Sequence, residues 1–239
     1  QIPWGHNLLI LTKIKDQSEA IFYIQQTLIN NWSRSILAHH IQSQLFQRKG
    51  ALDHNFPLTL PEAQSDLAEQ TLKSPYILDF LQLDETARER DLQRQLTHHI
   101  TSFLLELGKG FAFVGQEYEL KLGNRSNRLD LLFYHLKLRA YIVIELKMTA
   151  FQPEYAGKMN YYLNAVDDLL KTDVDNSSIG LILCRSKDQV VVEYALRGIT
   201  KPMGISEYQL IQSLPKDLAS SLPTIGELEQ ELKRYDEEN

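Results

Sequence analysis

The chain has 239 residues, of which 43% are hydrophobic and 23% charged, and its formal net charge is −6. This amount of apolar material is enough to bury a core, which excludes a generally disordered chain, and the length allows one large domain or two small ones. The acidic balance argues mildly against a protein that binds nucleic acid through its overall charge, although binding depends on local patches rather than on the sum.

The cellular setting is inferred from what the sequence lacks. The single cysteine, Cys184, cannot form an internal disulfide, so a buried thiol in a reducing compartment is expected. No apolar stretch approaches the ~20 residues that cross a bilayer, and no signal peptide is visible at the start. The sequence begins with Gln1 rather than Met, which is typical of a fragment or a processed chain. We therefore expect a cytoplasmic protein without a membrane partner.

Two helices joined by a tight turn are predicted near the start of the chain. The first covers 16–31 and opens with Asp16 and Glu19 in capping-box spacing. The second begins after Ser33, a favourable N-cap residue, and ends before Gly50. This arrangement is compatible with a helix-turn-helix, but an ordinary helical hairpin gives the same pattern more often.

A linker with short helical pieces is predicted over 51–75, because this segment contains three prolines and has no sustained hydrophobic period. The pattern changes after it, so a domain boundary is expected near 75–84. The chain is therefore divided into an N-terminal helical domain with its linker, 1–82, which we expect to be truncated, and a second domain, 83–239.

The second part of the chain mixes helices and strands. The predicted elements are, in order, a helix over 86–107, strands over 111–122, 128–135 and 140–148, a helix over 153–170, a strand over 179–184, a segment of ambiguous type over 190–196, a strand over 205–210 and a helix over 224–235. The short link 136–139 makes its two flanking strands an antiparallel hairpin. This order predicts an α/β fold with a mixed central sheet flanked by helices.

Three charged residues stand in two otherwise apolar strands. Glu145 and Lys147 are two positions apart, so their side chains point to the same face of their strand. Asp130 lies in the preceding strand, and the antiparallel hairpin sets it opposite Glu145. Charged groups are rarely buried unless they are paired or bind a metal. Two carboxylates are therefore expected to converge, with a lysine beside them.

The chemistry of this group suits phosphodiester hydrolysis. Carboxylate oxygens are ligands that Mg²⁺ or Mn²⁺ prefers, and the Leu146 carbonyl is a candidate further metal ligand beside Asp130 and Glu145. Lys147 would stabilise the charge that develops on the phosphate or help to deprotonate the attacking water. A salt bridge at a strand end is the alternative, and it would be favoured for Glu145 and Lys147 alone. Asp130 in a buried strand favours the metal site, with Asp130, Glu145 and Lys147 as the catalytic set.

These residues and the order of the elements around them resemble the PD-(D/E)XK nuclease superfamily. Longer segments resemble its YhcG family, namely 103–115, 130–135, 145–147, 153–157 and 179–184. The segments 30–33 and 42–46 resemble the N-terminal domain of that family, which is thought to be winged-helix-like. The resemblance covers nearly the whole chain. It implies a restriction-endonuclease-like core preceded by a winged-helix-like domain.

The chain departs from the YhcG pattern at three positions. The resemblance implies an acid on the first core helix just after Leu92, where this chain has Gln93. Glu89, one turn earlier, is a candidate replacement, although a solvated glutamate on a helix face is the more common explanation. The pattern also has glutamines near Glu117 and Lys158. Glu117 is a candidate carboxylate from the first strand, and Lys158 is a candidate phosphate contact from the second helix.

Other polar residues give weaker signals. Arg125 and Arg128 precede Asp130 in an expected loop and are candidate phosphate contacts, although exposed arginines commonly have this pattern. The pairs His39–His40 and His98–His99 each diverge on a helix and cannot share one metal ion.

The resemblance implies a Mg²⁺- or Mn²⁺-dependent endonuclease that cuts DNA in repair, recombination or defence against foreign DNA. The alternative is a DNA-binding or assembly protein that retains the nuclease fold with weak or no activity, and Gln93 keeps this alternative open. DNA is the expected partner in both cases, and RNA is not excluded. Self-association into a homo-oligomer through the N-terminal helices is part of the second interpretation.

Overall fold

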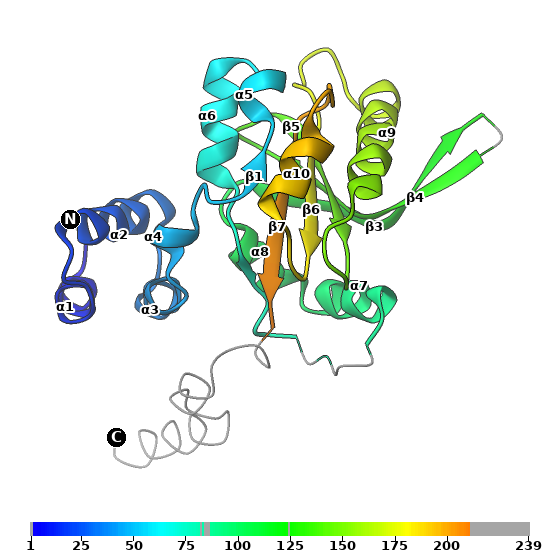
Figure 1. The fold of residues 1–239 in the computed structure, drawn as a ribbon. Helices are drawn as coiled ribbons and strands as arrows, with labels where there is room; N and C mark the ends of the chain where they lie inside the picture. Colours follow the sequence, from blue (N-terminus) through cyan, green and yellow to red (C-terminus); the bar gives the residue numbers. More distant parts are fainter. Residues whose placement is uncertain (1, 82, 84–86, 124, 211–239) are drawn as a thin grey trace.

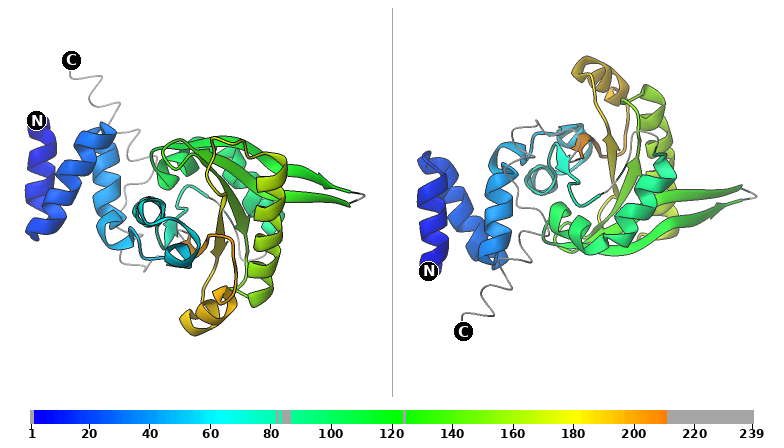
Figure 2. Two further views of the ribbon diagram at one scale, coloured as in Figure 1. Left: turned by 90° about the horizontal axis from the view of Figure 1, so that it is seen from above. Right: turned by 90° about the horizontal axis from the view of Figure 1, so that it is seen from below.

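The computed structural model describes residues 2–81, 83, 87–123 and 125–210 (Figure 1). Within these ranges a seven-stranded sheet carries helices on both faces, and a group of helices lies to one side of it (Figures 1 and 2). The helices are α1 Trp4–Lys13, α2 Gln17–Asn30, α3 Arg34–Gln42, α4 Leu45–Arg48, α5 Phe56–Thr59, α6 Glu62–Thr71, α7 Glu89–His98, α8 Ile100–Leu107, α9 Pro153–Leu169 and α10 Gln189–Leu196. The strands are β1 Asp53–His54, β2 Tyr76–Ile77, β3 Phe111–Leu122, β4 Arg125–His135, β5 Ala140–Leu146, β6 Ile179–Cys184 and β7 Met203–Gln209.

Helices α1–α4 make up the N-terminal helical unit, residues 2–48. The Asp16 carboxylate accepts a hydrogen bond from the Glu19 amide at 2.8 Å and caps α2, and Ser33 caps α3, as the capping patterns predict. The second predicted helix is interrupted, because Gln44 adopts a left-handed conformation with φ of 53°. Residues 2–48 contain no strand, so this segment lacks the β-strands that form a wing.

The segment predicted to be a linker is part of the core instead. Strand β1 pairs antiparallel with β7, and β2 pairs parallel with the same strand. Leu52, Phe56 and Leu72 are buried in the cluster that covers one face of the sheet. Strands of two residues and a helix of four are too short to show a hydrophobic period, and their partner lies about 150 residues away in the chain. The long-range pairing therefore leaves no signal in the local sequence.

The sheet has the strand order β1-β7-β6-β5-β4-β3 and is mixed, as predicted. Strands β3, β4 and β5 form an antiparallel meander, whereas β5, β6 and β7 run parallel. One hydrophobic cluster packs α5–α8 on one face, and a second packs α9 and α10 on the other (Figure 2). The all-apolar β6 lies between these two layers, as expected for a strand covered on both faces.

Other predicted elements differ in detail. The helix predicted over 86–107 is broken at His99 into α7 and α8, and Gly108, with φ of 107°, ends the second of them. The ambiguous segment is helix α10, because the Asp188 carboxylate accepts hydrogen bonds from the first free amides. The predicted helix over 224–235 lies outside the described residues. None of the helices in the described part combines the length and apolar character that crossing a bilayer requires.

The hairpin of β3 and β4 projects past α9 on the side away from the N-terminal helical unit (Figures 1 and 2). The register of the two strands shifts between Phe113 and Gly115. Glu117 has φ of 43°, which is an unusual conformation for a residue with a side chain. Asp130 lies on β4 of this hairpin.

Candidate metal and catalytic centre

The pairing of β4 with β5 brings two carboxylates to the same level of the sheet. Leu131 pairs with Ile144, so Asp130 lies level with Glu145. The Leu146 amide donates a hydrogen bond to Asp130 Oδ2 at 2.8 Å. The N–H and C=O of a strand residue face the same neighbouring strand, so the Leu146 carbonyl also faces Asp130. Two carboxylates and one carbonyl oxygen therefore lie on neighbouring strands at the end of β5.

Glu145 is 2% exposed and is held by two lysines. Its Oε1 lies 3.2 Å from Lys147 Nζ and 2.5 Å from Lys158 Nζ. Its Oε2 has no hydrogen-bond partner among the described residues. A buried carboxylate oxygen without a partner is unfavourable, and a divalent cation would satisfy it. The arrangement of these groups thus fits a metal ion.

Helix α7 contributes two of the candidate accessory residues. Glu89 Oε2 lies 3.0 Å from Lys147 Nζ, so Glu89 is an ion-pair partner within the centre rather than only a solvated residue on a helix face. Gln93 Nε2 donates a hydrogen bond to the backbone carbonyl of Asp130 at 2.9 Å. Gln93 therefore supports the strand that carries Asp130, where the YhcG pattern led us to expect an acid.

Burial and the charge of Glu145 shift the pKa of Asp130 in the same direction, and they shift the pKa values of the two lysines in opposite directions. Burial raises the pKa of Asp130 to about 6, and the charge of Glu145 raises it as well. Burial acts to lower the pKa of Lys147 and of Lys158, but the charge of Glu145 outweighs it in both, so both pKa values are raised. Both lysines are therefore charged near neutral pH. The raised pKa of Asp130 reflects its burial first and the charge of Glu145 second.

Three other predicted residues lie near the edge of the centre or outside it. Glu117 lies level with Asp130 across the β3–β4 pairing, but it is exposed and its closest cation is Arg128, at 3.9 Å. Arg128 itself is exposed. The side chain of Arg125 lies outside what the structure describes.

Two aromatic residues of α9 also belong to the centre, and neither was predicted to be part of it. Lys147 Nζ lies 5.3 Å from the ring centre of Tyr155, and Lys158 Nζ lies 5.2 Å from that of Tyr162. A lysine over a ring is stabilised by a cation–π contact. The spacing of Tyr155, Lys158 and Tyr162 on one helical face was the available signal.

Histidine and cysteine do not add ligands here. In the part of the chain that the structure describes, no group of three or more His, Cys, Asp or Glu side chains could hold a metal ion. A site in this centre therefore depends on two carboxylates, a backbone carbonyl and water, which is a ligand set that suits Mg²⁺ or Mn²⁺ rather than zinc.

Comparison with known proteins gives two family matches. The model of the YhcG PDDEXK nuclease domain matches residues 69–223, and that of the DUF1016 N-terminal domain matches residues 1–48. "Putative nuclease YhcG" of Escherichia coli (strain K12) is 34% identical over 216 residues, which are 89% of this chain and 57% of that protein. The chain therefore spans little more than half the length of this relative.

Two solved structures are more distant. "Structure of EndoMS-dsDNA2 complex" has a TM-score of 0.37 at 14% identity and covers 55% of this chain and 47% of its own. A repair endonuclease from Pyrococcus abyssi has a TM-score of 0.34 at 11% identity, with 54% and 49% covered. Scores of this size do not establish a common fold.

Proposed function

Because this chain belongs to the family of the YhcG PDDEXK nuclease domain, we propose that it is a divalent-metal-dependent endonuclease that hydrolyses phosphodiester bonds in DNA. The observation that carries the proposal is the meeting of Asp130 with Glu145, whose buried Oε2 lacks a partner among the described residues. Burial and the charge of Glu145 raise the pKa of Asp130, and carboxyl groups perturbed in this way cluster at functional sites.

In this proposal the carboxylates of Asp130 and Glu145 and the Leu146 carbonyl hold Mg²⁺ or Mn²⁺. When bound, such an ion lowers the pKa of an attacking water and counters the charge of the scissile phosphate. Gln93 positions Asp130 through its hydrogen bond to the backbone carbonyl. A bound ion would neutralise the charge of Glu145. Lys147 and Lys158, which pair with Glu145 in this structure, would then be free to contact substrate.

Lys147 is the proposed catalytic cation. Glu89 and the ring of Tyr155 hold its ammonium group beside Glu145, and its raised pKa keeps it charged. A charged lysine donates hydrogen bonds to phosphate oxygens and stabilises the extra negative charge of the transition state. Its protonated form does not accept a proton from water, so of the two roles predicted for Lys147 the electrostatic one is favoured.

Contacts to the DNA backbone are proposed for Lys158, Arg128 and Arg125. The Lys158 side chain is 44% exposed and can leave Glu145 for a phosphate, and Arg128 lies exposed on the projecting hairpin. Backbone contacts of this kind are electrostatic and depend on local positive charge rather than on the net charge of the chain. Roles in repair, recombination or defence against foreign DNA are proposals that rest on the family alone.

The division of the chain is also a proposal. We propose two units, a helical one and a nuclease one, as in the division made from the sequence. The boundary between them is proposed near Gly50 instead of residue 82. The reason is that β1 and β2 pair with β7 of the sheet.

A second copy of the chain is proposed as a partner through α1. Trp4 is 74% exposed and Leu11 72% exposed on this helix, and large apolar side chains at such exposure favour association. Sedimentation of the whole chain tests this proposal, and a monomer at tens of micromolar would contradict it.

A cleavage assay tests the central proposal. The whole chain is incubated with linear duplex, nicked, branched and single-stranded DNA in Mg²⁺, in Mn²⁺ and in EDTA, with single-stranded RNA as a further substrate. Cleavage of at least one DNA form in metal and none in EDTA is expected. Cleavage that persists in EDTA would contradict metal dependence, and cleavage of RNA alone would contradict DNA as the substrate.

The second candidate function is a DNA-binding or assembly protein that retains the nuclease fold. Gln93 favours it, because this residue stands where the family pattern has an acid. Tight DNA binding without cleavage of any form in either metal would support this function over the first.

A further inference from the structure

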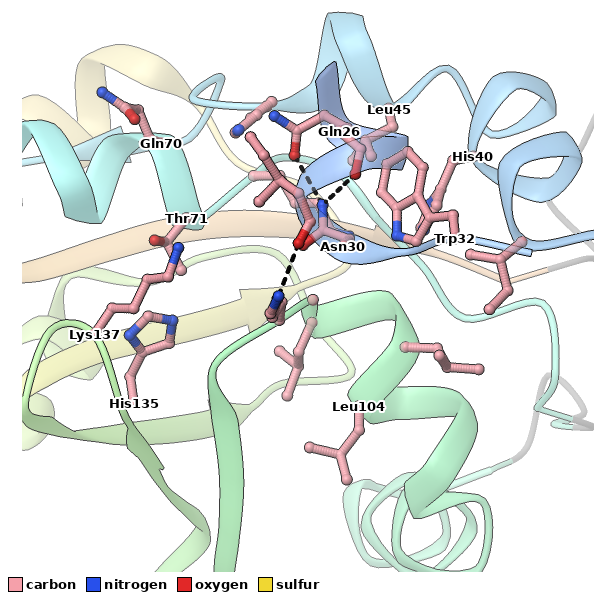
Figure 3. A pocket seen from close by; sticks show the side chains of 18 of the residues that line it. Gln26, Asn30, Trp32, His40, Leu45, Gln70, Thr71, Leu104, His135 and Lys137 are labelled. Carbon is pink, nitrogen blue, oxygen red and sulfur yellow. Dashed lines mark hydrogen bonds between the residues drawn. The ribbon is translucent and has the colours of Figure 1, made fainter. Parts of the chain in front are cut away.

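A cavity of about 550 Å³ lies between the N-terminal helical unit and the nuclease core (Figure 3). Helices α2, α3 and α4 line one side, and α6, α8 and the turn between β4 and β5 line the other. None of its lining residues belongs to the metal and catalytic centre. Cavities of this size commonly hold small organic ligands.

The lining of this cavity is basic, although the chain as a whole carries a formal charge of −6. Lys49, Lys73, Lys109 and Lys137 line it, and no Asp or Glu does so among the described residues. Glu106 neutralises Lys73 from behind the wall, at 3.3 Å. The other three lysines form no ion pair within the described part of the chain.

Two of these lysines, Lys49 and Lys137, are close enough to repel each other, and all three line the same cavity. Burial lowers the pKa of Lys49, and the positive charge of Lys137 lowers it further. Lys109 Nζ donates one hydrogen bond to the Ile29 carbonyl at 2.8 Å, which leaves two donors of the ammonium group. Cations that repel one another at a cavity are stabilised by an anion between them.

A buried histidine and a tryptophan form one wall of the cavity. His40 is 5% exposed, and its Nδ1 has no hydrogen-bond partner in the described part of the chain. Its ring lies against Trp32 with ring centres 4.2 Å apart, and both residues line the cavity (Figure 3). The paired rings of Trp32 and His40 give this wall an aromatic surface against which a flat group can pack.

We propose that this cavity binds a free nucleotide, with its phosphate groups between Lys49 and Lys137 and its base beside Trp32 and Leu104. Amide side chains that donate and accept hydrogen bonds to a base edge are also in the lining, namely Gln26, Asn31 and Gln70. An inorganic phosphate would occupy a small part of the volume and leave the aromatic and amide groups without a role. The size and the mixed lining therefore favour a nucleotide over a simple anion.

Isothermal titration calorimetry of the whole chain tests this proposal. The probes are ATP, ADP, inorganic phosphate and a 5′-phosphorylated single-stranded oligonucleotide, all in EDTA so that the metal centre does not contribute. We expect ATP or ADP to bind at least about 10-fold more tightly than phosphate. The double variant Lys49→Gln/Lys137→Gln should lose about 10-fold in nucleotide affinity. Lys171→Gln, an exposed lysine outside the cavity, should bind like the unmodified chain.

Several results would overturn the proposal. If the double variant binds nucleotide as tightly as the unmodified chain, the nucleotide does not bind in this cavity. If phosphate and ATP bind with equal affinity, the ligand is a simple anion and not a nucleotide. Binding of the oligonucleotide alone would assign a strand end in place of a free nucleotide. Circular dichroism checks that the double variant folds. If the double variant does not fold, Lys137→Gln alone, at an exposed position, provides a second test and should also weaken nucleotide binding.

Discussion

Two glutamates of this chain are equally buried, and each is held by two cations, but their surroundings differ. Glu106 on α8 is 2% exposed and lies 2.6 Å from Arg48 and 3.3 Å from Lys73. Glu145 on β5 is also 2% exposed and lies 2.5 Å from Lys158 and 3.2 Å from Lys147. Burial and ion pairing alone therefore do not distinguish the two sites.

The difference lies in the charges around each carboxylate. Oε2 of neither glutamate makes a hydrogen bond among the described residues, but that of Glu106 lies 3.3 Å from Lys73 Nζ. The Ile77 amide also donates to Glu106, and the side chains of Arg48 and Lys73 are only 6% and 4% exposed. Burial acts to raise the pKa of Glu106, but the charges of Lys73 and Arg48 outweigh it, so the pKa is lowered. This cluster joins α4 to the core, and its two cations neutralise the charge of Glu106.

The Glu145 cluster contains more acid than its cations neutralise. Asp130 adds a second carboxylate whose pKa burial and Glu145 raise to about 6, and Glu89 adds a third at Lys147. The Lys158 side chain is 44% exposed, so this cluster is open to solvent on one side. A buried glutamate with balanced cations thus stabilises the fold, whereas one with surplus acid and an open side suits a metal ion.

The largest expected effects separate the two glutamates. Glu145→Gln should reduce cleavage of DNA in Mg²⁺ by roughly 1000-fold, about 4 kcal/mol of transition-state stabilisation, because a proposed metal ligand is lost. Glu106→Gln should leave the cleavage rate of the folded protein within a few-fold. The measurement is the initial rate of cleavage on whichever DNA form the chain cuts best.

Stability should respond in the opposite order. Glu106→Gln leaves Arg48 and Lys73 buried without a counter-charge and should cost about 3–5 kcal/mol in urea unfolding. Glu145→Gln in EDTA should cost clearly less, because Lys147 keeps Glu89 as a partner and Lys158 reaches solvent. Equal losses of stability in the two variants would remove the distinction between the clusters.

Lys147→Ala should reduce cleavage by about 100-fold while sparing the fold in Mg²⁺. The physical reason is that the metal ion neutralises Glu145 when the lysine is removed, so no buried charge is left alone. Melting temperature in Mg²⁺ and cleavage rate are measured together, with Lys171→Ala as a control at an exposed position. Unchanged cleavage would end the catalytic role, and a large loss of melting temperature in Mg²⁺ would favour a structural ion pair.

The sequence was informative wherever the determining contacts are local. The short link 136–139 was enough to set Asp130 level with Glu145, because an antiparallel hairpin has one register for a given link. The caps at Asp16 and Ser33 were also predictable, since a capping side chain bonds an amide two or three residues away. Helix α1 was missed because Pro3, its N-cap residue, makes no side-chain cap.

Contacts between distant residues could not be predicted in this way. Glu89 reaches Lys147 across 58 positions, and β1 finds β7 across about 150. Lys158 was interpreted as a phosphate contact, and its ion pair with Glu145 depends on how α9 packs over β5. Such contacts are set by tertiary packing, which leaves no periodic pattern in a single sequence.

The two clusters should also respond to pH with opposite sign. The pKa of Asp130 is raised in the folded protein, so folding is favoured by protonation and stability increases as pH falls through about 6. In EDTA the free energy of unfolding should therefore increase by about 1.4 kcal/mol from pH 7 to pH 5. The pKa of Glu106 is lowered, so the stability that its ion pairs contribute is fully present above pH 4.5, its ordinary pKa, and is lost at lower pH.

Urea unfolding from pH 4 to pH 8 measures the pH dependence of both clusters. Asp130→Asn should remove the increase between pH 7 and pH 5, and its persistence in that variant would contradict the assignment.

The smallest expected effect concerns the position where the family pattern has an acid. Gln93→Glu loses the hydrogen bond to the Asp130 carbonyl, because a carboxylate does not donate, and this should cost about 1 kcal/mol in EDTA. It also adds negative charge beside Asp130 and Glu145, so the Mg²⁺ concentration for half-maximal cleavage should fall several-fold. Gln93→Met loses the same hydrogen bond without adding charge and is the matched control. It should lose similar stability with no gain in Mg²⁺ affinity. If both variants show the same Mg²⁺ dependence as the unmodified chain, Gln93 lies too far from the ion to replace a metal ligand, and its role is limited to supporting Asp130.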